Sequence, residues 1–225
     1  MMVVLFGASA AALHAQDYRV FIMGGGSTLL DRQHYTVYGA AFESYYKTGA
    51  SFTVGAEIPV FRIFSAEGSY GISHNNLIVN NFVNSTEPNN ETGYMIQDQR
   101  ISGDVVAHAE KPIKGVRPYF VAGVELDRFS ATSAAAALAQ SEGFNGVPNA
   151  VLSPDNKFGY NFGFGLDISL THMLALRVDA RDHIFGSPTF GLPAAATSAF
   201  TAYYPIGGNA QDLVYSVGAV FHFGK

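Results

Sequence analysis

The residues of this chain that could act as catalysts fall in two places. Ser73 and His74 are adjacent, and a second group combines Asp179, Asp182 and His183. Serine, histidine and a carboxylate are the residue types of a hydrolase, in which the histidine takes the proton of the attacking hydroxyl and the carboxylate orients the imidazole. Neither group stands in a motif with a diagnostic context. The alternative is polar residues at solvated strand ends, so the sequence assigns no catalytic residue.

Sites for cofactors or metals have little support in the sequence. Gly24-Gly25-Gly26 lacks the strand–loop–helix setting of a phosphate loop and instead indicates a bend or a close packing point in a strand. The histidines are scattered, without the paired spacing of metal ligands. The chain has no cysteine, which excludes disulfides and thiol-based metal or redox sites. We therefore expect no cofactor and no bound metal.

Charged residues recur at alternate positions of the strand-like segments. By this alternation eleven of them share the face opposite to the large apolar residues: Arg19, Glu57, Glu67, Arg100, Asp104, Glu125, Asp127, Asp167, Arg177, Asp179 and Arg181. In a closed barrel that face lines a lumen, where isolated charges are very costly and must pair or hydrogen-bond. We interpret the set as a structural network that fills the lumen. The alternative is a gated path for protons or ions.

The segment 158–170 shows the pattern that must position these charges. Every second residue from Phe158 to Leu170 is large and apolar, and the residues between them are Gly, Asn, Asp or Ser. A strand with this sequence has one apolar face and one small or polar face. The apolar face could point into the core of a soluble barrel or outward into lipid. The segments 51–58, 119–127 and 213–223 alternate in the same way.

The order of strands and connections favours the lipid alternative. Eight strands are expected at about 18–28, 48–61, 62–78, 95–110, 116–130, 157–170, 173–186 and 212–224. Their connections are alternately short (59–63, 110–115, 169–172) and long (29–47, 79–94, 131–156, 187–211), with a short helix possible at 132–140. This rhythm is typical of an all-β, eight-stranded antiparallel up-and-down transmembrane barrel with short periplasmic turns and long outer loops. A soluble ligand-binding barrel has no reason to place all its long loops at one end.

Composition and the N-terminus agree with this fold. Of the 225 residues, 48% are hydrophobic and only 14% charged, against about 25% charged in a typical soluble domain. The net charge of -5 argues against a nucleic-acid partner. Residues 1–15 form an apolar run that becomes rich in small residues, as in a secretory signal peptide, although the basic start is missing. An apolar N-terminal strand or helix is the alternative. Residues 16–225 are expected to form a single barrel domain.

These strands, their connections and the last strand resemble one family. The strand Leu213–Phe223 carries aromatic residues at alternate positions near the C-terminus. Together with the eight alternating strands, it resembles the small eight-stranded outer-membrane barrels, the OmpA-like and OmpX-like group. The departure is Gly224-Lys225 after Phe223, where the family often ends on the aromatic residue. The resemblance implies a Gram-negative outer-membrane location, contact with outer-membrane lipid, recognition of the last strand by the barrel assembly machinery, and a monomer.

Four functions follow from these interpretations. The leading hypothesis is a non-enzymatic outer-membrane protein with an envelope-structural or surface-contact role. The alternatives are a narrow channel for small solutes, a lipid-directed outer-membrane hydrolase and a soluble ligand-binding barrel. The face of the sheet on which the large apolar side chains lie distinguishes the three membrane-protein hypotheses from the soluble barrel. In a membrane barrel, the residues expected to point away from the axis are Phe52, Val54, Phe120, Val124, Phe162, Phe164, Leu176, Val178, Val217 and Phe221.

Overall fold

The computed structural model describes residues 18–82, 90–197 and 201–224. The strands are β1 (Tyr18–Leu29), β2 (Gln33–Val37), β3 (Ala40–Phe61), β4 (Phe64–Phe82), β5 (Asn90–His108), β6 (Val116–Ala131), β7 (Asp155–Ser169), β8 (Leu174–Gly186) and β9 (Asn209–Phe223), with one short helix, α1 (Ser133–Ser141), in this part of the chain. Within the described ranges no helix has the length and apolar character needed to cross a membrane. The expected leader, residues 1–15, lies outside the described residues.

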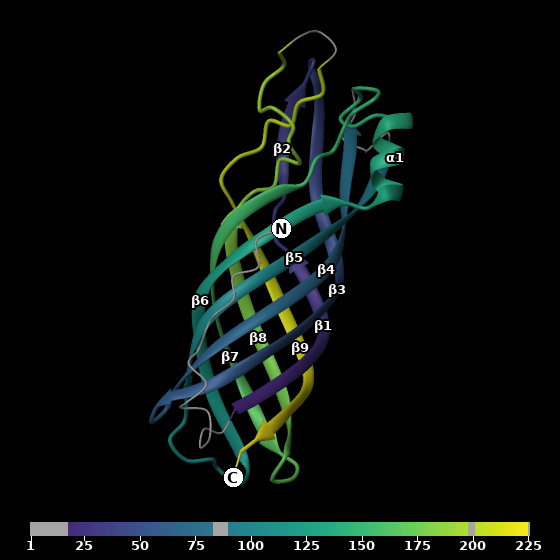
Figure 1. Cartoon of the computed structure of the whole chain (residues 1–225). Coiled ribbons are helices and arrows are strands. Elements are labelled where there is room, and N and C mark those ends of the chain that lie inside the picture. Colours follow the sequence, from purple (N-terminus) through teal and green to yellow (C-terminus); the bar gives the residue numbers. More distant parts are fainter. Residues whose placement is uncertain (1–17, 83–89, 198–200, 225) are drawn as a thin grey trace.

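Eight of the strands close into a ring. Each strand from β3 to β9 pairs antiparallel with the next, and β1 pairs antiparallel with both β9 and β3. Closure leaves no free edge around the ring, which is the condition for a sheet to cross a membrane. Figure 1 shows the tilted strands wound into a tall barrel. The prediction of an all-β, eight-stranded up-and-down barrel is confirmed.

The short connections lie together at one end of the barrel, the lower end in Figure 1, where β9 also ends. They are residues 62–63, 109–115 and 170–173. In the second of them, Ile113 and Val116 form a bridge around Lys114 and Gly115, whose φ angles are 50° and 84°. Two successive positive φ angles define the hairpin turn whose twist matches that of the flanking strands, and glycine favours it. We call the end with the short connections the inner end. The opposite end, with the long connections, is the outer end.

The prediction that residues 29–47 and 79–94 form long loops is partly wrong. The strand β2 lies inside the first and pairs with the beginning of β3 through a tight turn at Tyr38 and Gly39, which both have positive φ. Residues 79–82 and 90–94 extend β4 and β5, which remain paired up to Asn81 and Asn90. Residues 79–82 and 90–94 are rich in Asn, Thr and Glu, residues that favour turns. Pairing with neighbouring strands overrides that local preference, so this part of the sheet projects beyond the ring.

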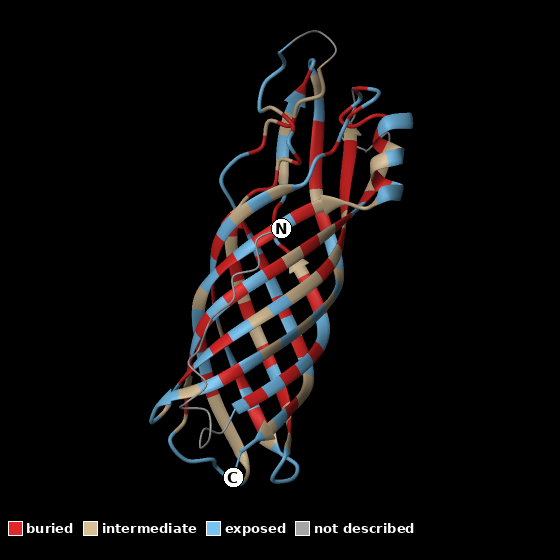
Figure 2. Cartoon of the chain, viewed as in Figure 1, coloured by how far each residue is buried: buried red, intermediate tan, exposed pale blue. Residues whose placement is uncertain are grey.

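The side chains of the ring face as expected. The ten residues predicted to point outward do so: nine have more than a third of their surface exposed, and Leu176 is half-buried. Phe120, at 70% exposed, and Phe164, at 61%, show the extreme. Figure 2 displays the resulting alternation of buried and exposed residues along the strands. The soluble-barrel alternative requires these residues to lie in a closed interior. Their exposure contradicts that alternative.

The outward face is apolar only up to a limit. Toward the outer end, the outward positions of β4, β5, β6 and β7 become polar at His74, Gln99, Arg128 and Asn156. Between that limit and the inner turns, the outward side chains are mostly Phe, Tyr, Val, Leu and Ile. An outward apolar band bounded by polar residues is the surface of a barrel that spans a bilayer.

The long connections at the outer end form a core of their own. We call it the outer cap, and it consists of buried residues from the strand ends, α1 and the loops: Leu29, Val37, Phe42, Tyr46, Leu77, Val79, Tyr94, Ile96, Phe129, Ala135, Ala139, Phe144, Ala150, Leu152, Phe185, Phe190, Leu192, Tyr204, Ile206 and Ala210. The ring of Phe144 lies 5.2 Å from that of Tyr94 and 5.3 Å from that of Tyr204. The helix expected at 132–140 is confirmed by α1, and the side chain of Thr132 caps its first turn.

Truncating the centre of the outer cap should open the loops and leave the barrel folded. Phe144 is fully buried, and Phe→Ala changes in cores cost about 3–5 kcal/mol. For Phe144→Ala we expect faster protease cleavage of the segment 132–154 in the folded protein, with the barrel still resistant to detergent until heated. The matched control is Phe158→Ala, because Phe158 is 70% exposed on the outer wall. Equal cleavage in both variants would contradict a packed cap.

One carboxylate ties two of the loop segments together above the apolar band. Asp155, at the start of β7, accepts hydrogen bonds from the Thr189 amide at 2.8 Å and the Thr189 hydroxyl at 3.1 Å, and Lys157 Nζ lies 3.0 Å away. Burial alone would raise the pKa of Asp155, but these hydrogen bonds and the Lys157 charge outweigh it and lower the pKa.

This lowered pKa gives the loop contact a defined pH dependence. A depressed folded-state pKa contributes stability above the unfolded pKa, which is about 4. That stability is lost as the pH falls through the folded-state pKa. We expect the Thr189 amide to exchange with solvent faster on acidification below pH 4, and Asp155→Asn to exchange fast at all pH values. A Thr189 exchange rate that does not respond to acid would disprove the contact.

Candidate functional site: the lumen network

The eleven charged residues expected to face the lumen are all buried inside the barrel. They are joined there by Asp98, His108, Tyr119, His183 and Asp212. The contacts divide them into two groups. The inner cluster contains Arg19, Glu57, Glu67, Asp104, His108, Tyr119, Asp167, Arg177, Asp179 and Arg181. The outer cluster contains Asp98, Arg100, Glu125, Asp127, His183 and Asp212.

Arg177 is the centre of the inner cluster. Its guanidinium donates to Asp167 at 2.7 and 2.9 Å, to Glu57 at 2.9 Å and to Glu67 at 3.1 Å. The side chain is completely buried, and its guanidinium carbon lies 4.7 Å from the centre of the Tyr119 ring. The planar fork of arginine presents five donors in a fixed geometry, so it can bridge several carboxylates at once. One cation therefore contacts three carboxylates from three strands.

Arg181 joins the inner cluster to the middle of the lumen. It contacts Glu67 at 2.7 Å, Asp179 at 2.9 Å and Asp104 at 3.2 Å. The Tyr119 hydroxyl donates to Asp179 as well. Tyr119 can lie here because Gly165 has no side chain: a Cβ at that position would come within 2.3 Å of the Tyr119 ring. The absence of a side chain at Gly165 therefore makes room for a larger lumen neighbour.

The inner end of the network is closed by a three-residue contact. Arg19 Nη1 lies 3.0 Å from Glu57 Oε1 and 3.0 Å from His108 Nε2. The same histidine nitrogen lies 2.5 Å from Glu57 Oε1. These residues come from β1, β3 and β5, so the contact spans the lumen close to the inner turns. All three side chains are buried at this level of the lumen.

The outer cluster surrounds Arg100. Its Nε lies 2.6 Å from Asp127 Oδ1, and its Nη2 lies 2.8 Å from Asp98 Oδ2 and 3.0 Å from Asp212 Oδ2. Glu125 Oε2 lies 4.0 Å from Arg100 Nε and 2.6 Å from His183 Nδ1. Four carboxylates thus surround one guanidinium and one imidazole.

The lumen holds little empty space between these clusters. One cavity of about 30 Å³ is lined by residues that include Ser69, Ser102 and Ser216, together with Arg100 and Arg181. A second, of about 10 Å³, lies next to Asp98. A cavity needs about 10–15 Å³ of such volume to hold one water molecule. These cavities accommodate a very few water molecules.

Five members of the network were not predicted to belong to it: Asp98, His108, Tyr119 and Asp212, and also His183, which was considered only for a hydrolase. All five have the same alternation parity as the lumen residues of their strands, so the signal was present. They were overlooked because only charges in the middle of the strands were considered, and because a tyrosine or histidine on a lumen face is not recognised by charge.

The residues considered for a hydrolase are not assembled as a catalytic group. Ser73 is buried on the lumen face, whereas His74 lies on the opposite face and contacts Gln97 at 3.3 Å. Of the second group, Asp182 points outward and accepts from Gln211, whereas His183 faces the lumen and contacts Glu125. Across the described residues, no hydrogen bond joins His74 or His183 to a serine, and no group of His and acidic side chains is arranged to hold a metal ion.

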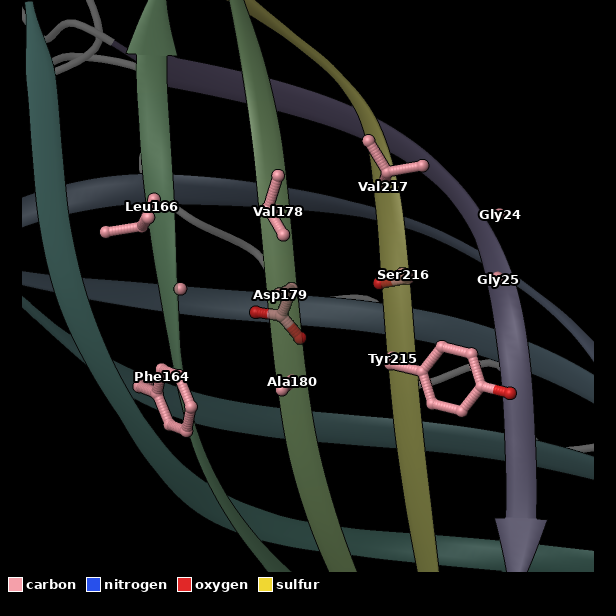
Figure 3. A pocket seen from close by; sticks show the side chains of 11 residues that line it. Gly24, Gly25, Phe164, Leu166, Val178, Asp179, Ala180, Tyr215, Ser216 and Val217 are labelled. Carbon is pink, nitrogen blue, oxygen red and sulfur yellow. The ribbon is translucent and has the colours of Figure 1, made fainter.

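The outer wall of the barrel carries a shallow apolar hollow of about 350 Å³ across β7, β8, β9 and β1. Figure 3 shows the rings of Phe164 and Tyr215 on either side of the small Ala180 side chain. Val178 and Val217 continue the hollow toward the inner end. The hollow lies within the outward apolar band, on the opposite side of the wall from the charge network.

Comparison with solved structures finds this architecture in known proteins. The outer membrane protein OprG from Pseudomonas aeruginosa matches with a TM-score of 0.60 at 12% identity, over 94% of this chain and 98% of that one. Neisserial surface protein A matches with a TM-score of 0.55 at 12% identity, over 92% and 97%. The chain has the fold of the small outer-membrane β-barrels. The resemblance inferred from its strands is thereby confirmed at the level of fold.

A third match to this outer-membrane barrel fold is the outer membrane protein AlkL, solved in DMPC lipid bilayers, with a TM-score of 0.50 at 13% identity over 100% of this chain and 98% of that one. No family model matches the sequence, and no curated protein matches it. The outer-membrane barrel fold is therefore established by structure, and the role of this barrel must be argued from its own residues.

Proposed function

We propose that this chain is a non-enzymatic protein of a bacterial outer membrane, closed to solutes, that presents its outer cap at the cell surface for an envelope-structural or surface-contact role. The observation that carries the proposal is the packing of the lumen. Buried ion-paired side chains occupy it in two clusters, and the buried residues of the outer cap pack at its outer end. A barrel closed in this way offers its surroundings its outer end and its wall.

The surface of the barrel supports a proposal for its location and assembly. The outward apolar band suits outer-membrane lipid. The solved proteins with a similar fold, OprG and Neisserial surface protein A, are an outer-membrane protein and a surface protein. In the last strand, Leu213, Tyr215, Val217, Phe221 and Phe223 are exposed and face outward. Tyr18 and Phe223 stack at 5.1 Å across the seam between β1 and β9. We propose that the barrel assembly machinery recognises this strand, that residues 1–15 direct export, and that the closed ring functions as a monomer.

The two alternative functions need features that the described residues supply less well. A narrow channel would have to pass Arg177 and Arg100, each held by three or more carboxylates. A lipid-directed hydrolase would need a serine, a histidine and an acid on one side of the wall, but Ser73 and His74 lie on opposite faces. The closed barrel is therefore the function that the geometry supports best.

Conductance across a planar bilayer tests the proposal. The folded protein, inserted from detergent, should give no steady conductance at neutral pH. Inserted protein is verified separately by protease protection of the barrel in vesicles of the same lipid. A large and steady wild-type conductance would refute the closed barrel and favour the channel. Release of fatty acid from the vesicle lipid, followed by mass spectrometry, would instead favour the hydrolase.

A further inference from the structure

We propose that the outer cluster is a proton-binding site, in which the carboxyl groups around Arg100 hold at least one proton between them at neutral pH. The ligand is a proton shared by buried Asp and Glu side chains, not a metal ion. The site lies between the lumen cavities and the outer cap. This inference goes beyond the closed-barrel function and does not depend on it.

The charges of the outer cluster do not balance without a bound proton. Four carboxylates, those of Asp98, Glu125, Asp127 and Asp212, surround Arg100. With His183 also protonated, four negative charges meet two positive ones, which leaves a deficit of two. The inner cluster is closer to balance: its five carboxylates (Glu57, Glu67, Asp104, Asp167, Asp179) face three arginines and His108, four cations if the histidine is protonated.

Among the residues that the structure describes, no further cation contacts the outer cluster. Arg181 is committed to three carboxylates of the inner cluster. Lys157, the register partner of Asp127 on β7, pairs instead with Asp155 at 3.0 Å. The remaining polar neighbours are neutral: Ser27 donates to Asp212, and Asn161 donates to Asp104 on the side of the inner cluster. The deficit must therefore be met by something bound.

The hydrogen bonds point to the same conclusion independently of the charge count. Asp98 Oδ1, Glu125 Oε1 and Asp127 Oδ2 have no hydrogen-bond partner. Their residues are 3%, 2% and 0% exposed. An ionised carboxylate only accepts, so none of these oxygens can donate to another acceptor while all three groups are ionised. A proton on one of the carboxyl groups would turn it into a donor and would remove one of the negative charges gathered around Arg100.

The arrangement suits a proton better than a metal ion. The described residues contain no group of His and acidic side chains arranged to hold a metal. The carboxylates converge on the guanidinium: Asp98 and Asp212 approach the same nitrogen, Arg100 Nη2, at 2.8 and 3.0 Å. Arg100 Nη2 can donate one N–H to each of them, but its single positive charge cannot balance both carboxylates, and carboxylates that share a site commonly share a proton.

The outer cap seals this site. Each strand that supplies a cluster residue supplies a cap residue two positions away on the same face: Ile96 beside Asp98, Phe129 beside Asp127, Phe185 beside His183 and Ala210 beside Asp212. The cap therefore separates the carboxylates from the bulk water at the outer end. Loss of the bound proton would place additional negative charge directly under it, so we infer that proton binding and a closed cap support each other.

Infrared spectroscopy of the full chain folded in lipid vesicles tests the site. At pH 7 we expect a carbonyl band of protonated carboxyl groups that shifts in deuterium oxide. Asp98→Asn and Asp127→Asn should each reduce or displace this band. The matched control is Asp167→Asn in the inner cluster, where Arg177 holds both carboxylate oxygens; this variant should leave the band unchanged. A wild-type spectrum without the band overturns the proposal, and so does a band that both outer variants retain.

Proton release on unfolding gives a second readout. Exposed Asp and Glu side chains are ionised at pH 7, so unfolding the wild type in weakly buffered urea should release at least one proton per chain. Both Asn variants of the outer cluster should release fewer protons than the wild type. No release from the wild type, or a stability that rises with added Na⁺ or Ca²⁺ in the absence of the band, would show that the four carboxylates are ionised and overturn the proton site.

Discussion

Arg177→Ala is expected to destabilise the folded barrel by about 3–5 kcal/mol, the range for removing one partner of a buried ion pair. The substitution leaves Glu57, Glu67 and Asp167 buried without the cation that they share. The stacking of the guanidinium on Tyr119 is lost as well. Urea unfolding from lipid vesicles, followed by tyrosine fluorescence and gel mobility, measures the change in the free energy of unfolding.

Asp167→Ala is the matched control, because it breaks the same contact from the other side. Arg177 then keeps Glu57 and Glu67 as partners, and the lumen loses a negative charge of which it has an excess. We therefore expect a clearly smaller loss of stability than for Arg177→Ala. A loss for Asp167→Ala that equals or exceeds that of Arg177→Ala would contradict the view that cations limit the network. Conductance should rise, if in any variant, in Arg177→Ala.

Much of the fold could be predicted because its constraints are local. Period-two alternation is set by the geometry of one strand, so the segment 158–170 alone indicates a two-faced strand, and its exposed Phe162 and Phe164 agree with it. The alternation of short and long connections then fixes the up-and-down order. The strand β2 and the extensions of β4 and β5 escaped prediction, because their residues favour turns and become strands only through pairing with β3 and with each other.

The site could be predicted only as a set of residues on one face. Parity places Arg100 and Asp127 in the lumen, but it cannot say that Arg100 also meets Asp212, 112 positions away. That contact depends on how the ring closes and how far neighbouring strands are staggered. The outer cap is hidden for the same reason, since Phe144, Phe190 and Tyr204 lie in segments without periodicity and become a core only by packing together.

Phe164→Arg is expected to destabilise the barrel by about 2–4 kcal/mol, the cost of an arginine on the lipid face near the bilayer midplane. Phe164 is 61% exposed, in the middle of the outward apolar run of β7. Its outward-facing neighbours in the outer hollow are Ala180, Val178 and Tyr215, which provide no anionic partner. The carboxylate of Asp179, which also borders the hollow, is bound to Tyr119 and Arg181 on the lumen side. The guanidinium would therefore have to reach toward the headgroups or draw water into the hydrocarbon. Urea unfolding from lipid vesicles measures this cost.

The control for lipid contact is Asn156→Arg, on the same strand and the same outward face but beyond the apolar band. The backbone pairing is alike at both positions, since each residue lies within the β6–β7 ladder, so the medium outside the wall is the main difference between them. At Asn156 we expect a change within about 0.5 kcal/mol, the range of ordinary surface substitutions. If Phe164→Arg were equally mild, the outward apolar band could not face hydrocarbon at the height of residue 164. A charged guanidinium placed among lipid chains is costly, however well the barrel itself is packed.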